Sequence, residues 1–131
     1  MLDTDILTYL IKNKPESVPQ RVNALGEDDE LCMSFVTYAE LLKGAEGSTR
    51  KGDVLRRLEG LTRQVPVVHP SGAALCEHFA VHSNRLKATG TPIGANDLWI
   101  ACQALAEAAV LVTNNESEFK RVAGLTVANW V

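Results

Sequence analysis

Short apolar runs alternate with longer segments of helical periodicity along the whole chain. The apolar runs hold two to six residues and are bounded by turn-forming residues, as buried strands are. Between them, apolar residues recur three or four positions apart, which is typical of the buried face of a helix. The runs predict strands at residues 1–2, 31–36, 64–69, 110–113 and 125–127. The periodic segments predict helices at 6–11, 14–25, 51–61, 70–88 and 97–109, another from Ser34 or Thr37 to Gly44 or Gly47, and a turn with a short helix at 114–120.

This alternation predicts the fold class. Strands that alternate with helices form parallel sheets with helices packed on both faces. We therefore expect a three-layer α/β/α domain with a central, mostly parallel sheet of four to five short strands. With 131 residues, of which 46% are apolar, the chain has material for one buried core, so we expect a single domain over residues 1–131.

The overall charge gives no attraction to polyanions. The net charge is −3, so a nucleic acid or an anionic membrane would have to be bound by a local basic patch or through a metal ion. Lys51, Arg56, Arg57 and Arg63 make one basic side of a predicted helix, which is more often solvated surface than a phosphate site. The acidic run at residues 26–30 is expected to be a solvated loop.

The cysteines and the charged residues indicate a compartment. Cys32, Cys76 and Cys102 are odd in number, far apart and in apolar contexts, which predicts buried thiols in a reducing environment. Charged residues interrupt both the start of the chain and its longest apolar region, so neither a secretory signal nor a membrane span is expected. We expect a cytoplasmic protein.

Acidic residues recur where the predicted strands end. Asp3 follows the first strand, Glu40 the second and Glu118 the fourth, while Asp97 opens the helix before the fourth strand. Right-handed crossovers return the chain to the same edge of a parallel sheet, and ligands of open α/β sheets bind at that edge. These four carboxylates are therefore expected to meet in space although they are distant in the chain.

Each of these acids also has a purely structural explanation. An acid in the first turn of a helix, such as Asp97, interacts favourably with the helix dipole. Glu40 fits a capping box with Thr37, and Thr4 or Asp5 can cap the first helix. His78 and His82 stand four apart as zinc ligands often do, but the Glu of a zinc-protease motif and a third ligand are missing, so we expect no metal there.

Clustered carboxylates without nearby cations predict a divalent metal site. Several carboxylates close together repel one another and raise their pKa values unless a cation holds them. Oxygen ligands favour Mg²⁺ or Mn²⁺ over zinc. Such ions lower the pKa of bound water and neutralise charge on a phosphodiester that is being hydrolysed. A bound ion would also let a chain with a net negative charge bind a nucleic acid.

Four motifs together resemble one protein family. The motifs are Leu2-Asp3-Thr4, Ala39-Glu40-Leu41-x-x-Gly44, Pro92-Ile93-Gly94-x-Asn96-Asp97-x-x-Ile100-Ala101 and Leu111-Val112-Thr113-Asn114-Asn115-x-x-Glu118-Phe119. In order and spacing they are similar to the PIN-domain toxins of the VapBC toxin–antitoxin type, and the likeness runs nearly end to end.

The resemblance implies an activity, a cofactor and partners. It implies an endoribonuclease dependent on Mg²⁺ or Mn²⁺, neutralised by a VapB-type antitoxin whose tail enters the site, and a homodimer that forms a hetero-oligomer with that antitoxin. By position, Asp3, Glu40 and Asp97 would be metal-binding catalytic carboxylates, with Glu118 as a fourth. The likeness to members that cut initiator tRNA in its anticodon loop suggests tRNA as the substrate.

Some residues depart from the family pattern, and two other functions compete. Asp5 stands where many members have Asn, and Asn115 stands where many have Asp. These differences leave open whether the chain has a second metal site. Only two residues precede Asp3, so the natural start could lie upstream. A haloacid-dehalogenase-like phosphatase would use Asp3 and Asp5, but Ile6 and Leu7 replace its expected Gly and Thr. The other alternative is a catalytically inactive PIN-like binding module.

Overall fold

The computed structural model describes residues 1–131 and is built on five short parallel chain segments. Val67–Val68 (β2) pairs with Met33–Ser34 (β1), and Leu111–Val112 (β3) pairs with Val127–Ala128 (β4), both in parallel. The first residues of the chain join the two pairs. The Leu2 amide donates to the Cys32 carbonyl at 2.8 Å, and Leu2 forms a parallel bridge with Val112. The segments therefore lie side by side in the spatial order β2, β1, residues 1–3, β3, β4.

Side-chain alternation on these segments builds two cores. Met1 and Leu111 belong to one buried cluster, whereas their neighbours Leu2 and Val112 belong to the other. Successive strand residues point to opposite faces of a sheet, so residues 1–2, Leu111–Val112 and Val127–Ala128 each contribute to both clusters. This explains why the runs are apolar throughout instead of alternating with polar residues.

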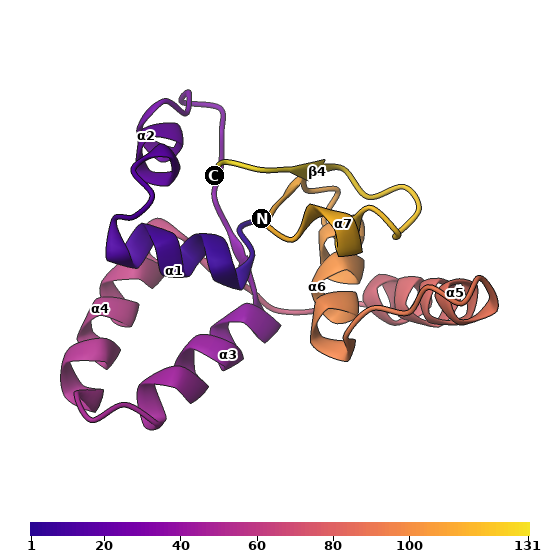
Figure 1. Cartoon of the computed structure of the whole chain (residues 1–131), viewed down its shortest axis with the longest axis horizontal. Coiled ribbons are helices and arrows are strands. Elements are labelled where there is room, and N and C mark those ends of the chain that lie inside the picture. Colours follow the sequence, from indigo (N-terminus) through magenta and orange to yellow (C-terminus); the bar gives the residue numbers. More distant parts are fainter.

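Helices cover both faces of the sheet (Figure 1). One core takes side chains from Thr4–Lys12 (α1), Ser17–Asn23 (α2) and Lys51–Gln64 (α4). The other core takes side chains from Ala74–Ala88 (α5), Ala95–Ala106 (α6) and Glu116–Phe119 (α7). Phe35–Glu46 (α3) contributes to both and contacts α4 and α6. The predicted three-layer α/β/α arrangement is confirmed.

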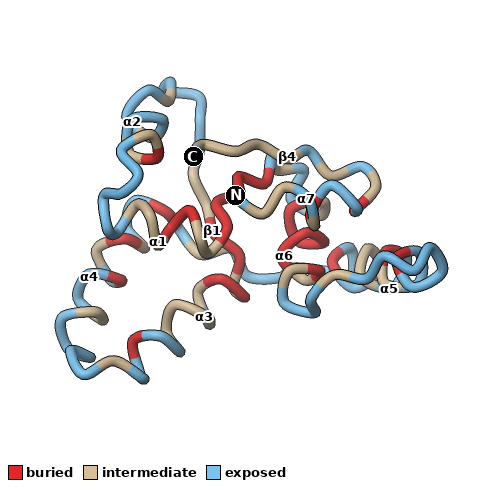
Figure 2. The backbone as a smooth tube through the Cα atoms, in the orientation of Figure 1, coloured by how far each residue is buried: buried red, intermediate tan, exposed pale blue.

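Buried residues concentrate along the sheet segments and α6, whereas the distant end of α5 and the connection between α3 and α4 are largely exposed (Figure 2). None of the helices is both long and apolar enough to serve as a transmembrane span. The acidic loop at 26–30 is mostly exposed, as expected.

Several predicted boundaries are wrong by a few residues. The second strand ends at Ser34, because Phe35 and Val36 already belong to α3. Helix α5 begins at Ala74, not at residue 70, since Gly72 adopts φ +71° and interrupts the helix there. The other differences are that α1 begins at Thr4, α2 at Ser17 and α6 at Ala95, α4 ends at Gln64 and α6 at Ala106, and β4 is Val127–Ala128.

One prediction about the cysteines is also wrong. All three are free, but only Cys102 is buried, and Cys76 is exposed. Cys76 lies on α5, where its neighbour Leu75 occupies the face that enters the core. Periodicity over a moderately apolar helix did not distinguish these two adjacent positions.

Candidate functional site

Asp3 lies at the carboxyl end of the central sheet segment and caps α1. Its Oδ1 accepts from the Thr4 amide at 2.8 Å, and its Oδ2 accepts from the Thr113 hydroxyl at 2.8 Å. The cap had been predicted at Thr4 or Asp5, but the first helical residue is Thr4, so the cap falls one position earlier. Asp3 is only 5% exposed, which makes it a buried carboxylate held from two sides.

Glu40 has no capping role in this fold. The cap of α3 is Ser34, whose hydroxyl accepts from the Val36 amide at 3.1 Å. The predicted capping box with Thr37 is wrong because Thr37 is already inside the helix. Glu40 lies in the second turn of α3 instead, and its Oε1 accepts from the Thr4 hydroxyl at 2.8 Å. The side chain is thereby held beside the start of α1.

Asp97 and Glu118 meet from two further helices. Asp97 is in the first turn of α6, but Gly94 is the cap residue and no side chain bonds the free amides there. Glu118 lies near enough to Asp97 for its charge to raise the pKa of Asp97, and Glu118 accepts from the side-chain amide of Asn115. The favourable interaction of an acid with the helix dipole is therefore not a sufficient explanation for Asp97, because a second acid, Glu118, lies near it.

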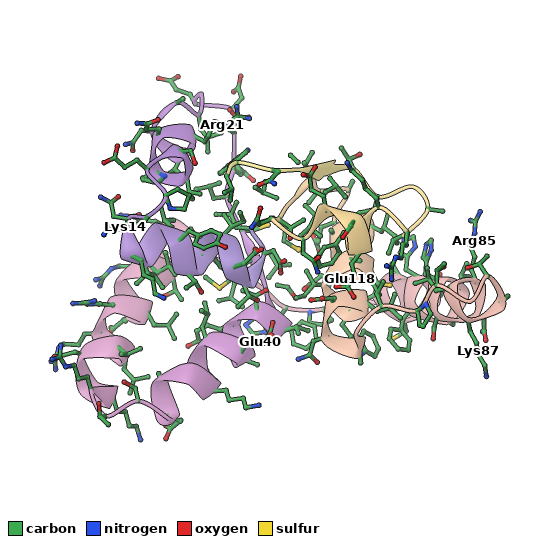
Figure 3. The ribbon with its side chains drawn as sticks, in the orientation of Figure 1. Lys14, Arg21, Glu40, Arg85, Lys87 and Glu118 are labelled. Carbon is green, nitrogen blue, oxygen red and sulfur yellow. The ribbon has the colours of Figure 1, made fainter.

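Asp3, Glu40 and Asp97 border one cleft at the switch point of the sheet. Numbered by their order in the chain, the segments lie across the sheet as 3-2-1-4-5. Successive segments are therefore added on one side of residues 1–3 first and then on the other side, and the switch point lies between residues 1–3 and β3. Ligands of open α/β sheets bind outside such a point. A cleft of about 460 Å³ lies there, lined by Asp3, Thr4, Asp5, Thr8, Tyr9, Glu40, Asp97 and Asn115. Glu118 is not part of this lining and reaches the cleft through Asp97. Glu40 on α3 and Glu118 on α7 can be located in Figure 3.

Burial and mutual repulsion raise the pKa values of two of these carboxyls. Burial, with added repulsion from Asp5 and Asp97, raises the pKa of Asp3 to about 7, although its hydrogen bonds with Thr113 and Thr4 oppose the rise. Burial also raises the pKa of Asp97 to about 6, with repulsion from Glu118 and Glu40 adding to it. In the metal-free chain, the carboxyls of Asp3 and Asp97 are therefore partly protonated near neutral pH, and a bound cation would displace these protons.

The donor set fits a hard divalent cation. All the acids offer oxygen, and none of the residues lining the cleft is Lys or Arg. The three salt bridges of the chain involve other acids, namely Glu46, Asp53 and Glu116. No three acidic, His or Cys side chains stand close enough to enclose an ion by themselves. That arrangement suits Mg²⁺, which keeps several waters and takes few protein ligands.

Two residues that depart from the family pattern also line the cleft. Asp5 accepts from the Ile6 amide at 2.7 Å and from the Asn114 amide at 3.1 Å, so one of its oxygens ties α1 to the end of β3. Asn115 donates to Glu118. Sequence reasoning assigned no role to Thr113, which it placed as the last residue of the strand at 110–113, although a polar residue at the end of an apolar strand was a usable signal.

The histidine pair lies elsewhere and has a structural environment. His82 is buried on α5 and stacks against His78, with ring centroids 5.9 Å apart. Burial, together with His78 and Arg85, lowers the pKa of His82. No third metal-binding side chain joins them.

The pKa of Asp3 predicts how the stability of the metal-free protein depends on pH. The folded-state value of about 7 lies above the ordinary 3.8, so the folded chain binds more protons between these values and loses stability as pH rises through that window. Asp3→Asn should remove this loss, which makes the variant more stable than the wild type by about 2 to 4 kcal/mol above pH 7 and nearly equal at pH 4. Urea unfolding in EDTA at several pH values measures this difference. A difference between the two proteins that does not change with pH would contradict it.

Comparison with known proteins identifies a consistent set of relatives. The pattern of the PIN domain family matches residues 1–125. The chain is similar to Ribonuclease VapC1 of Haemophilus influenzae, with 48% identity over 130 residues that cover 99% of this chain and 96% of the relative. It is also similar to the tRNA(fMet)-specific endonuclease VapC of Shigella flexneri, with 38% identity over 134 residues that cover 99% and 96% of the two chains.

A solved structure has the same fold. A chain of VapBC-1 from nontypeable Haemophilus influenzae superposes with a TM-score of 0.92 at 48% identity, covering 99% of this chain and 96% of that one. The family match, the two relatives and the shared fold therefore agree on one family.

Proposed function

Because this chain belongs to the PIN domain family and to its VapC ribonuclease branch, we propose that it is the toxin of a VapBC-type pair and hydrolyses RNA with Mg²⁺ or Mn²⁺. The observation that carries this proposal is the convergence of Asp3, Glu40 and Asp97 on a cleft that no Lys or Arg lines. A polyanionic substrate can enter such a cleft only when a cation offsets the carboxylates. The PIN match over residues 1–125 argues against the phosphatase alternative.

Asp3, Glu40, Asp97 and Glu118 are the residues that would hold the ion, some of them directly and the others through its bound waters. A bound Mg²⁺ or Mn²⁺ would lower the pKa of water and offset negative charge on the phosphodiester. Hydroxyl groups and one backbone amide of the chain orient the carboxylates that would bind the ion. Thr113 and the Thr4 amide fix the two oxygens of Asp3, and the Thr4 hydroxyl fixes Glu40. Ligands held in this way need little rearrangement when the substrate binds.

The substrate and the partners are part of the same proposal. A relative named for specificity toward tRNA(fMet) supports tRNA as the substrate, and we propose the anticodon loop as the place of cleavage. A chain of a VapBC complex resembles this chain, which supports a VapB-type antitoxin as the protein partner. We further propose that the antitoxin binds a homodimer of this chain. Copurification with a coexpressed antitoxin, followed by light scattering, would test the stoichiometry.

The decisive experiment is incubation of the purified chain with total tRNA, with Mg²⁺, with Mn²⁺ and with EDTA, and mapping of the ends by primer extension. The proposal predicts one dominant cut that requires a divalent ion. RNA binding without cleavage would favour the inactive binding module. Release of phosphate from small phosphomonoesters without RNA cleavage would favour the phosphatase.

The hydroxyl of Thr4 gives a smaller prediction. It donates to Glu40 and lies 3.2 Å from the Thr37 hydroxyl, so Thr4→Val removes a bond to a charged acceptor without changing the shape of the side chain. A bond of this kind is worth about 1.5 to 3 kcal/mol, so the kcat/KM of cleavage should fall roughly tenfold to a hundredfold. The matched control is Thr4→Ser, which keeps the hydroxyl and should stay near wild type. Equal loss in both variants would show that packing, not the hydroxyl, matters there.

A further inference from the structure

A second recess adjoins the acidic cleft. It has a volume of about 490 Å³ and lies between α3 and α6, lined by Phe35, Val36, Ala39, Glu40, Lys43, Asn96 and Trp99. Glu40 lines both hollows, so they are continuous at that side chain. Asn96, which lines the recess, directly precedes Asp97, which lines the acidic cleft. A polymer with a backbone group in the acidic cleft would therefore reach this recess, past Glu40, with a neighbouring unit.

The aromatic wall of the recess is held in place. Trp99 stacks on Phe79 of α5 with ring centroids 3.8 Å apart and an interplanar angle of 11°. Both rings pack against the buried core without being fully covered. The plane of the indole is thereby fixed by α5 before any ligand arrives, which lowers the entropy cost of stacking against it.

One cation belongs to these two hollows. Lys43 is exposed at the recess, and no other Lys or Arg lines either the recess or the acidic cleft. It lies on α3, three residues from Glu40, so it is on the same face of the helix. A fixed aromatic ring beside an exposed cation is the pair of features that single-stranded nucleic acids use, the ring for a base and the cation for a phosphate.

We propose that this recess receives an unpaired nucleobase adjacent to the phosphodiester in the acidic cleft, stacked on Trp99, with Lys43 on a neighbouring phosphate. The proposal rests on the ribonuclease function and adds the place where an unpaired base beside the cleaved bond is held. A duplex could not place a base there, because its bases stay stacked inside the helix. A second copy of this chain could also cover an aromatic recess, and the experiment distinguishes that occupant.

The test measures RNA binding, not cleavage. The protein carries Asp97→Asn, so that the RNA stays intact, and Trp130→Phe, so that Trp99 is the only indole. The probe is an RNA hairpin, and each loop nucleotide in turn is made abasic. Binding should quench the Trp99 fluorescence. Trp99→Ala, followed with a labelled hairpin, should raise the dissociation constant roughly tenfold to a hundredfold, and Trp99→Phe should recover most of that loss.

The abasic series makes the assignment specific. One loop position should lower affinity in the parent and should have little further effect in Trp99→Ala, because the same stacking contact is already lost. Lys43→Gln should reduce the slope of log affinity against log salt by about 1. Lys87→Gln, at the distant end of α5 in Figure 3, is the matched control and should leave the slope unchanged.

Two results would overturn the proposal. One is additivity, in which every abasic position costs the same with and without Trp99. The other is a change of oligomeric state in Trp99→Ala by sedimentation velocity, which would make the recess a contact between copies of the chain. If coupling is found but the wild-type chain cuts no RNA with Mg²⁺ or Mn²⁺, the recess assignment stands and the nuclease proposal fails.

Discussion

Asp97→Asn is expected to reduce RNA cleavage roughly a hundredfold to a thousandfold, the range found when one group that stabilises transition-state charge is removed. The substitution keeps the size of the side chain but removes a negative charge from the middle of the acidic cleft. Burial, with repulsion from Glu118 and Glu40 added to it, already raises the pKa of Asp97. Removing the charge therefore removes an unfavourable buried charge from the metal-free chain, and the variant should be at least as stable as the wild type.

This stability makes the result interpretable. Lost activity in a chain that melts no earlier than wild type, and still binds its antitoxin, cannot be attributed to unfolding. Glu107→Gln is the matched control, since Glu107 is an exposed acid at the other end of the same helix. It should retain full activity. Cleavage in Asp97→Asn that still depends on metal at the wild-type rate would remove Asp97 from the site.

Removal of divalent ions should abolish cleavage, and Mg²⁺ or Mn²⁺ should restore it. A second measurement does not depend on activity. An ion that binds only the folded chain raises its stability by mass action, so Mg²⁺ should raise the Tm of the wild type. Asp3→Asn and Asp97→Asn should lose most of that increase, because each lacks a ligand. Failure of Mg²⁺ and Mn²⁺ to shift the Tm of the wild type at any concentration up to the millimolar range would contradict a metal site in this cleft.

The ion should also compete with protons. The pKa of Asp3 is about 7 and that of Asp97 about 6, so both carboxyls must lose protons for the ion to bind. Apparent Mg²⁺ affinity should therefore fall as pH is lowered from 7.5 to 5.5. Calorimetric titration in buffers of different ionisation enthalpy would detect the released protons.

Local pattern in the sequence determined the kinds of elements and their order. Strands that bury both faces are apolar throughout and amphipathic helices repeat every three to four residues, and both signals lie within a few adjacent positions. The acids were also visible locally, because Asp3, Asp97 and Glu118 stand next to the breaks between elements. The three-layer fold and the expected convergence of the acids followed from the handedness of parallel crossovers.

Local pattern was insufficient where two residues competed for one local role. Ser34 and Thr37 could each cap α3, and Asp3, Thr4 and Asp5 offered three caps for α1. The choice depends on where each strand stops, and backbone bonds between distant segments set that point. One such bond joins the Asp3 amide to the Val112 carbonyl at 2.9 Å. Once Ser34 is the cap, Glu40 is free for the cleft.

By itself, then, the sequence determined the fold class, the order of the elements and the presence of acids at their junctions, because these depend on near neighbours along the chain. Only the tertiary structure decided that the first segment lies between β1 and β3, that Glu118 meets Asp97, and that Trp99 stands beside the acidic cleft. These are contacts between residues far apart in the chain. They are selected by the packing of two cores against one sheet, which no short stretch of sequence contains.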